Sequence, residues 1–580
     1  MRQPESSAWK RFPRWLEVLF LLVLPPLTFW LLNFRQVHQA NSLDPFFYTG
    51  YINNAEDLLR RFGLLYYAVR FGLILPGRFF TWAFGAEPGY FAFRYALALT
   101  AGVPFYLFAR RLFNLPTAIL AYVSLMVSPW FARTLLWDHP DAAGVPYLLA
   151  AMSMLLLGRK PSWVRDGAAG VCASMAVNSN IFTTAILGIF GAVYVAALLL
   201  YGTTRRTLLK RGIRFGAGFV LVLAAGYGYY WSVLGMPRNI FKPSIDTALG
   251  LSLGGMAQYR TAGVAWLFRV THVLVPVLLA VCCLLAVVRR QMRFEIAVCS
   301  ASGIAVVAFF YVHQFLLNGD TLEFSYYFSY ALPTTFLMLV CLWHALRERG
   351  ELKSGVFLGV GLGATLLPAL QTSAAFLWLE RMKPAQWGAL AAATVVAVAL
   401  ARVAWNRQSA RTAASLCALV LLAFSVAAGF VSSANYQITR PFRLHEDSEG
   451  DQYRVAIQLI RETPKLSQGP GNVLFWYNNR TNNPINSVQS TYIWGASKMN
   501  RDAPEDPGMP HIGNFQMEQL RSLDVRYLIL LGETPAEIPA GLQALTKAGA
   551  GYDLLSTRDL HSGAMHVYWQ LVELTKRPPQ

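Results

Sequence analysis

Long apolar runs recur along roughly the first three quarters of the chain, and they limit what it can fold into. The first extends from Trp15 to Phe34, and each is close to the roughly 20 residues that a helix needs to cross a bilayer. The chain is 55% hydrophobic and 14% charged, whereas about 25% of residues in soluble domains are charged. We therefore predict a polytopic α-helical membrane protein.

We predict about thirteen membrane spans. No small-residue cleavage site follows the first run, so we interpret it as a retained helix rather than a signal peptide. The fifth and sixth spans come from one 35-residue stretch that we divide at Asn178-Ser-Asn180. The predicted spans are 15–34, 89–109, 115–135, 142–158, 167–182, 184–201, 213–234, 264–288, 294–317, 327–346, 355–379, 385–403 and 411–432.

The loop charges predict how the chain is oriented. An odd number of spans puts the two termini on opposite sides of the membrane. With the N-terminus in the cytoplasm, the cytoplasmic segments hold 23 Lys and Arg residues and the short outer loops hold six. This asymmetry follows the positive-inside rule. It predicts a multi-pass protein of the plasma (inner) membrane, with a cytoplasmic N-terminus and an extracytoplasmic C-terminal domain.

The net charge of +19 has the same origin, and it does not indicate a nucleic-acid partner. Residues 433–580 hold 14 basic and 15 acidic residues, so the whole excess lies in residues 1–432. There the basic residues cluster in short loops between spans. The six cysteines all lie in apolar runs, a pattern that favours packing over a disulfide framework or a metal site.

The composition changes at residue 433, which divides a transmembrane domain (1–432) from a C-terminal domain (433–580). Apolar runs shorten to strand length at 473–477, 527–531 and 565–569, and helical patterns lie at 453–461 and 538–548. This alternation predicts a small extracytoplasmic α/β domain.

The first outer loop, about residues 35–88, is the longest loop between spans, and it contains the candidate catalytic residue. Asp44 lies just beyond the first span among a proline and aromatic residues, a position suited to taking a proton from a substrate delivered by a lipid. The alternative is a carboxylate that pairs with an arginine or caps a helix. Farther along, the amphipathic run 58–71 predicts a helix lying in the interface.

Other polar residues are expected on the same side of the membrane as Asp44. Asp138 and Asp141 either line the site or cap a helix, with Asp141 placed as an N-cap would be. Arg94, inside the second span, either pairs with a structural carboxylate or serves the site. The basic residues would offset a phosphate charge, or they are solvated loop charges. The candidate substrate-binding residues are Tyr48, Arg78, Arg94, Arg133, Asp138, Asp141, Arg260 and Arg269.

The architecture resembles the GT-C superfamily of membrane glycosyltransferases, and most of all family 39, which includes protein O-mannosyltransferases and the lipid A aminoarabinose transferase. The resemblance rests on the acidic motif Leu43-Asp44-Pro-Phe-Phe-Tyr48, the polar turn from Arg133 to Asp141, and an outer domain after a thirteenth span. It implies a polyprenyl-phosphate sugar donor and a catalytic base at Asp44. Pro45 stands where the family often has a second acid, and Asn178 and Asn180 stand where it often has a lysine.

These observations predict an inverting glycosyltransferase on the outer face of the membrane. Its partners would be a polyprenyl-phosphate sugar, a lipid, glycan or protein acceptor, and membrane lipids. No cofactor is predicted, since a divalent metal at Asp44, Asp138 and Asp141 would need further oxygen ligands. Two alternatives stay open: a transporter or lipid flippase, and a catalytically inactive scaffold of the same architecture.

Overall fold

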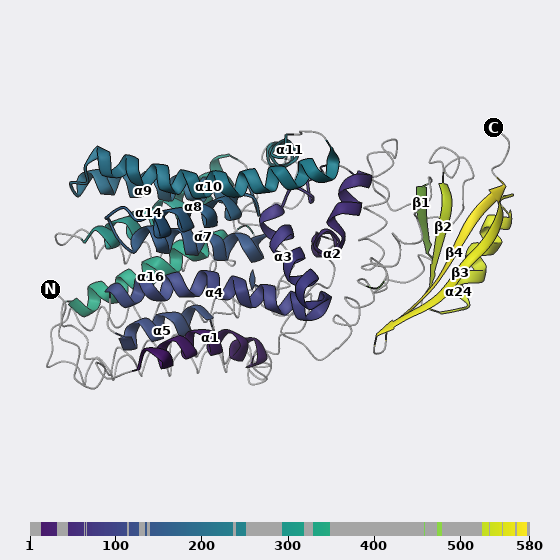
Figure 1. Cartoon of the computed structure of the whole chain (residues 1–580), viewed down its shortest axis with the longest axis horizontal. Coiled ribbons are helices and arrows are strands. Elements are labelled where there is room, and N and C mark those ends of the chain that lie inside the picture. Colours follow the sequence, from purple (N-terminus) through teal and green to yellow (C-terminus); the bar gives the residue numbers. More distant parts are fainter. Residues whose placement is uncertain are drawn as a thin grey trace, which may run out of the picture.

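The computed structural model describes residues 13–31, 44–62, 64, 66–112, 115–126, 131, 134–135, 140–235, 239–250, 293–317, 327, 329–348, 458, 472–477, 525–532, 534–547, 549–562 and 565–576. Within these residues, a bundle of helices is followed by a four-stranded sheet with one helix (Figure 1). The prediction of a mostly helical chain with a small C-terminal α/β part is confirmed.

Helices occupy, in whole or in part, nine of the predicted spans. The other four, 264–288, 355–379, 385–403 and 411–432, lie outside the described residues, so the total of thirteen stays a prediction. The helices are α1 (Arg14–Leu31), α2 (Asp44–Phe62), α3 (Phe71–Phe84), α4 (Ala86–Leu112), α5 (Leu115–Met126), α7 (Asp141–Leu156), α8 (Trp163–Val177), α9 (Thr183–Leu200), α10 (Arg205–Leu234), α11 (Lys242–Gly250), α14 (Phe294–Tyr311) and α16 (Leu332–Glu348).

Four of the described helical segments are long and apolar enough to cross a membrane: Pro88–Leu112, Thr183–Leu200, Arg205–Leu234 and Phe294–Gln314. Their lengths, 18 to 30 residues, match the hydrocarbon thickness of a bilayer. These segments identify the chain as a membrane protein.

The division at Asn178-Ser-Asn180 is confirmed. Helix α8 ends at Val177 and α9 begins at Thr183. Asn178 Nδ2 donates to the Ser174 carbonyl at 2.7 Å, and Asn180 Oδ1 accepts from the Phe182 amide at 3.1 Å. Both amide side chains satisfy backbone groups that the two helix ends leave open, which is why the helix stops here.

The prediction of a single helix over 58–71 is wrong. The first outer loop forms two helices, α2 and α3, with turns at 66–69 between them. The reason is a tertiary contact at the start of α3. The Gly72 amide donates to the Asn178 carbonyl at 3.1 Å, and a Cβ at Gly72 would collide with the Met175 carbonyl. The amphipathic pattern continues through this stretch and does not report that contact.

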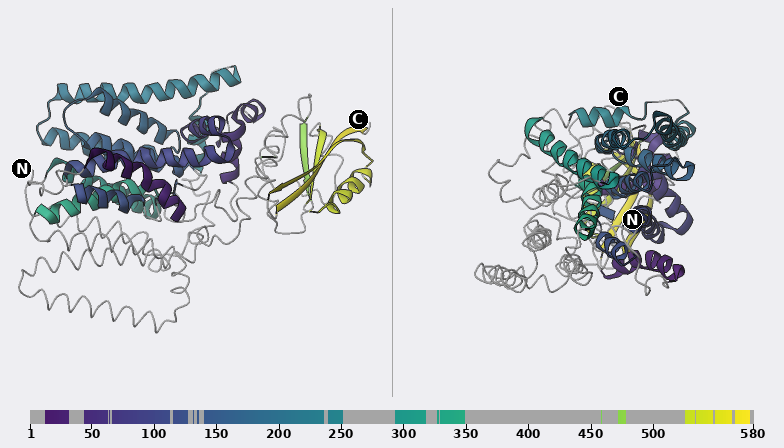
Figure 2. Two further views of the ribbon diagram at one scale, coloured as in Figure 1. Left: turned by 60° about the horizontal axis from the view of Figure 1, so that its bottom comes forward. Right: turned by 90° about the vertical axis from the view of Figure 1, so that its left-hand side faces the viewer.

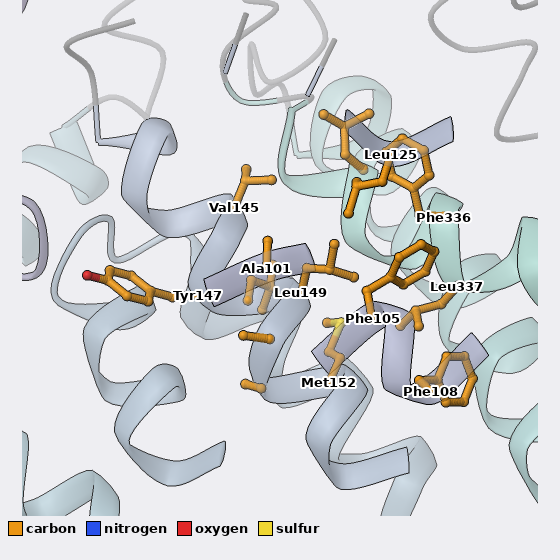
Figure 3. Close-up of a cluster of buried hydrophobic side chains, with 14 of the residues drawn as sticks. Ala101, Phe105, Phe108, Leu125, Val145, Tyr147, Leu149, Met152, Phe336 and Leu337 are labelled. Carbon is orange, nitrogen blue, oxygen red and sulfur yellow. The ribbon is translucent and has the colours of Figure 1, made fainter. Parts of the chain in front are cut away.

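Three helices meet in a close-packed interior. In Figure 3, Ala101, Phe105 and Phe108 of α4 face Leu149 and Met152 of α7, with Phe336 and Leu337 of α16 beside them. Most of these side chains are fully buried. The described cysteines Cys172, Cys299 and Cys341 are also buried and free, as expected for packing residues.

The bundle has two ends with different chemistry. In Figures 1 and 2, α2, α3 and the start of α7 lie at one end, which we call the loop end. The opposite end, which we call the basic end, contains the last turn of α4 and the starts of α8 and α10. Its basic residues include Arg110, Arg111, Arg159, Lys160, Arg165, Arg205, Arg206, Lys210, Arg211 and Arg214.

Arginines from three helices converge on the basic end of α7. Arg111 of α4 donates to the Leu156 carbonyl at 3.4 Å, and Arg211 of α10 donates to the Leu155 carbonyl at 3.3 Å. Arg165 of α8 bonds the Lys160 carbonyl in the turn that follows. A helix C-terminus carries partial negative charge and unpaired carbonyls. The arginines offset that charge and donate hydrogen bonds to the carbonyls.

The C-terminal part forms a sheet of order β1-β2-β4-β3, with β1 parallel to β2 and the other pairs antiparallel. Leu528 and Val572 on the sheet pack against Ile538 and Leu545 of the helix. The elements are β1 (Asn472–Tyr477), β2 (Val525–Gly532), α24 (Glu537–Lys547), β3 (Gly551–Ser562) and β4 (Met565–Lys576). Strand β3 was not predicted. The predicted helix at 453–461 lies outside the described residues, apart from Gln458.

Candidate functional site

Helix α2 begins at Asp44, the predicted catalytic residue, at the loop end of the bundle. The Asp44 side chain lies outside the part of the chain that the structure describes. One turn later, Tyr48 is buried, and its ring meets that of Tyr67 edge-on, with 5.4 Å between the centroids. Asp44 is therefore the first residue of the helix that places Tyr48 in the interior.

A buried arginine lies beside Tyr48. Arg70, in the segment between α2 and α3, is 2% exposed, and its guanidinium carbon lies 4.3 Å from the centre of the Tyr66 ring. Among the described residues, its Nε atom has no hydrogen-bond partner. Burying a charge costs several kcal/mol unless it is compensated. An unexplained buried cation is therefore a candidate binding group.

The charge of Arg70 is maintained by its surroundings. Burial by itself would lower the pKa of the guanidinium, but the neighbouring phenol groups, with Tyr66 first among them, raise the pKa on balance. Tyr48 and Tyr330 are the other tyrosines that contribute. These three phenols come from three separate segments, so Arg70 lies where the first outer loop meets the turn before α16.

Asp141 is a further buried charged residue near Tyr330. Its side chain is 1% exposed, and Oδ2 accepts a hydrogen bond from Ser329 Oγ at 3.2 Å. The Tyr330 ring packs against Gly144, one turn into α7, and Asp141 and Arg70 are both electrostatic neighbours of its hydroxyl. Tyr330 is therefore a neighbour of both a buried carboxylate and a buried guanidinium.

Asp141 is not the N-cap residue that the sequence suggested. Pro140 holds the N-cap position of α7, Asp141 is the first helical residue, and its Oδ2 accepts a hydrogen bond from Ser329 Oγ. The carboxylate lies at the N-terminus of α7, where the helix dipole is positive.

An aromatic cluster adjoins these polar groups. The Phe182 ring, two residues after Asn180, contacts the rings of Tyr330, Tyr327 and His313 with centroids 5.6 to 6.3 Å apart. His313 lies in a π-helical turn, Val312–Leu316, that ends α14. Such turns are rare and often occur at functional sites. The site thus joins a charged half to an aromatic half.

Arg78 occupies a separate position. Its guanidinium forms an ion pair with Glu56 of α2 and donates to the Asn53 carbonyl at 3.3 Å. Tyr229 of α10 donates to the same Glu56 carboxylate at 3.1 Å. These contacts join α2, α3 and α10. A substrate-binding role for Arg78 stays a prediction.

Arg94 is fully buried near the start of α4. Its guanidinium carbon lies 4.8 Å from the centre of the Tyr90 ring and 5.3 Å from that of Phe93. A small cavity beside it is lined by Thr49 and Ile52 of α2 and by Gly77 and Thr81 of α3. Arg94 therefore faces the side of α2 that follows Tyr48.

The structure does not place the other predicted residues. Arg133, Asp138, Arg260 and Arg269 lie outside the described residues. Tyr48 and Asp141 are brought together around Arg70 and Tyr330. The sequence analysis did not single out Arg70, Tyr66 or Tyr330. One local feature of the sequence could have pointed to Arg70. Tyr66 and Arg70 are four residues apart, immediately before an apolar helix.

No group of three or more His, Cys, Asp or Glu side chains arranged to hold a metal occurs among the described residues. The groups placed together are a guanidinium, phenols, one carboxylate and amides. In chemical terms, this is a buried cluster rich in hydrogen-bond donors, of the kinds that bind phosphates and sugars.

The fold and the site define a helical membrane protein with a buried charged cluster at one end of its bundle. No family model matches the chain, and no curated protein matches it. Among solved structures, it is similar to ArnT from Cupriavidus metallidurans bound to undecaprenyl phosphate, at 14% identity and TM-score 0.49, over 98% of this chain and 100% of that one.

Two further solved structures are similar to the chain. ArnT from the same organism in the apo state gives 14% identity and TM-score 0.42, over 96% of this chain and 98% of that one. The archaeal oligosaccharyltransferase AglB from Archaeoglobus fulgidus, in complex with an inhibitory peptide and a dolichol-phosphate, gives 13% identity and TM-score 0.41, over 90% of this chain and 70% of that one.

Proposed function

We propose that the chain is an inverting glycosyltransferase that moves a sugar from a polyprenyl-phosphate donor to an acceptor on the outer face of the plasma membrane. The observation that supports it most is the buried guanidinium of Arg70 among Tyr48, Tyr66 and Tyr330, at the end of the bundle where α2 begins with Asp44. A buried cation with phenolic donors suits the phosphate of a lipid carrier, which must stay at the membrane.

The reaction would be a single displacement. The acceptor oxygen forms a bond to the anomeric carbon while the bond from that carbon to the phosphate oxygen breaks, so the configuration inverts. Asp44 takes the proton of the acceptor, and the lipid phosphate leaves with the bonding electron pair. Arg70 offsets the charge that grows on the phosphate, and the tyrosine hydroxyls donate to it.

Other residues would bind or orient the substrates. Asp141 and Tyr48 would contact the sugar or the acceptor, with the rings around Phe182 as a stacking surface. The C-terminal domain would select the acceptor. The further substrate-binding residues we propose are Arg78, Arg94, Arg133, Asp138, Arg260 and Arg269.

The loop end would face outward. Most of the described Lys and Arg residues of the helix bundle lie at the basic end, and cytoplasmic loops are the ones enriched in such residues. This supports a cytoplasmic N-terminus and an outer site. A lipid-linked donor suits that side, since it needs no soluble nucleotide sugar there.

The test is a transfer assay with the purified full chain in detergent, where no vesicle gradient exists. The donors are polyprenyl-phosphate monosaccharides, and the readout is release of lipid phosphate together with labelled acceptor. Asp44→Asn is expected to lower kcat by about 100- to 10,000-fold, the usual contribution of a general base. The matched control is Asp246→Asn, which removes an exposed carboxylate that pairs with Lys242.

Full turnover by folded Asp44→Asn would reject the base role. Transport of a lipid or solute by the wild-type chain in sealed vesicles, with no transfer in detergent, would favour a transporter. Donor binding without turnover in the wild-type chain would favour a scaffold.

A further inference from the structure

The first turns of α10 carry a basic stripe beside an exposed apolar stripe at the basic end. Arg206, Lys210 and Arg214 recur every fourth residue, so they share one face of the helix. Next to them lie Leu209, 65% exposed, and Ile213, 56% exposed. A cationic stripe beside an apolar one is suited to the boundary between lipid headgroups and acyl chains.

Helix α8 contributes to the same surface. Trp163 is 61% exposed and Val164 is 83% exposed. The Arg214 guanidinium carbon lies 5.1 Å from the centre of the Trp163 ring, a cation–π contact that joins the two helices. Tryptophan is favoured at the membrane interface because its ring is apolar and its N–H is polar.

Close packing fixes this surface. A Cβ at Gly170 would collide with the Phe215 carbonyl, and one at Gly218 would collide with the Gly167 carbonyl, so α8 and α10 touch along their backbones. The Arg211–Asp166 ion pair, 2.9 Å long and buried, joins the same two helices. The exposed groups are therefore held in place before any ligand arrives.

The three cations of the basic stripe, of which Arg206 and Lys210 are exposed and Arg214 is half-buried, are not neutralised by the protein. Asp166 pairs with Arg211 and Arg165, and Glu295 pairs with Arg111. Across the described part of the chain, Arg206, Lys210 and Arg214 form no ion pair with a carboxylate. Their charge is available to a partner that lies at the level of the headgroups.

We propose that this surface, formed by Trp163, Arg206, Lys210 and Arg214, binds the phosphate headgroup of an anionic phospholipid in the leaflet at the basic end. The phosphodiester accepts hydrogen bonds from the basic stripe, and the acyl chains lie over Val164, Leu209 and Ile213. The site is at the opposite end of the bundle from Arg70, so it does not depend on the proposed transferase activity.

The experiment measures lipid binding by the full chain. Purified protein is titrated with phosphatidylglycerol and with phosphatidylcholine of the same acyl chains, and bound lipid is counted by native mass spectrometry. Wild type is expected to prefer phosphatidylglycerol. In the triple variant Arg206→Gln, Lys210→Gln, Arg214→Gln, the preference for phosphatidylglycerol over phosphatidylcholine is expected to fall by about 10- to 100-fold. Each interfacial cation contributes to the attraction, and salt screens part of that attraction.

Two controls separate a site from bulk charge. Lys242→Gln, Lys547→Gln, Arg558→Gln removes three exposed charges elsewhere and should leave the preference unchanged; an equal loss there would overturn the proposal. Trp163→Leu keeps every charge and should weaken the binding of phosphatidylglycerol several-fold. The proposal therefore stays testable if the triple variant does not fold. Unchanged binding in Trp163→Leu, or displacement of the lipid by millimolar inorganic phosphate, would also overturn it.

Discussion

Arg70 is the side chain at the loop end whose burial most needs a functional explanation. It is an arginine in a loop that the structure buries completely, among tyrosines that come from distant parts of the chain. Arginine presents donors in a planar fork that matches phosphate, and lysine cannot reproduce that geometry. The role of Arg70 can therefore be tested by conservative change.

Arg70→Gln is expected to raise KM for the lipid-phosphate donor and lower kcat, with kcat/KM falling about 10- to 150-fold. The reason is the loss of hydrogen bonds to a charged group, each contributing about 1.5–3 kcal/mol. Arg70→Lys should recover part of the loss. Steady-state kinetics on the purified chain provide the measurement.

The matched control is Arg60→Gln, which removes an exposed arginine from the same outer loop. It should leave kcat/KM within about twofold, as expected for a solvated surface charge. Equal losses in Arg60→Gln and Arg70→Gln would show that only the overall loop charge matters.

Part of the site could be predicted from residues alone. Asp44, Tyr48 and Asp141 stood out because polar groups next to membrane spans are costly and need a reason. Arg70 did not stand out, since a loop arginine is usually solvated. Its burial depends on contacts with Tyr330, far along the chain, and no local pattern reports such a contact.

At the scale of elements, the apolar pattern predicted where helices lie, but it did not predict which elements they contact. The spans around α4, α9 and α14 follow from apolar length. The break between α2 and α3 does not, because the Gly72 contact with the α8–α9 turn decides it. Strand β3 was overlooked because Asp553, Arg558 and Asp559 interrupt its apolar pattern, as charged residues often do on an edge strand.

Gly72→Ala is expected to lower both the melting temperature and the transfer activity. The added methyl would meet the Met175 carbonyl and the Ser179 side chain and push α3 away from the α8–α9 turn. Gly216→Ala is the control, because nothing lies within 4 Å of a Cβ there. It should be neutral or slightly stabilising, by up to about 1 kcal/mol. Indistinguishable melting curves would contradict the contact.

Leu528→Ala is expected to destabilise the C-terminal domain by about 2–5 kcal/mol, since it removes a fully buried side chain between β2 and α24. Leu554→Ala on β3, where the side chain is 54% exposed, should cost far less. Limited proteolysis of the full chain in urea would report the difference. Similar cleavage rates in the two variants would contradict the packing described.

At the scale of the whole molecule, the strongest prediction from sequence is the difference between the two ends. Loop charges assigned the basic end to the cytoplasm, and the described helices do gather those residues at one end. Which side each end faces rests on the positive-inside rule. That assignment can be tested in intact cells.

Lys242→Cys, exposed in α11, is expected to react with a membrane-impermeant maleimide added to intact cells. Lys210→Cys, at the basic end, should react only after the cells are opened. Cys172, Cys299 and Cys341 are buried, and the parent chain provides the background signal. The reverse labelling pattern would overturn the proposed orientation and an outer site.

The arginines that converge on the end of α7 have a consequence for biosynthesis. Helix α7 leaves the ribosome before Arg211 of α10 has been made, so the Leu155 carbonyl, to which Tyr194 of α9 also donates, receives its cation only after more than fifty further residues. Its final anchoring is thus postponed until three later helices have entered the membrane. Nascent chains arrested before α10 should therefore hold α7 loosely, and the arrival of Arg211 should be the event that locks it.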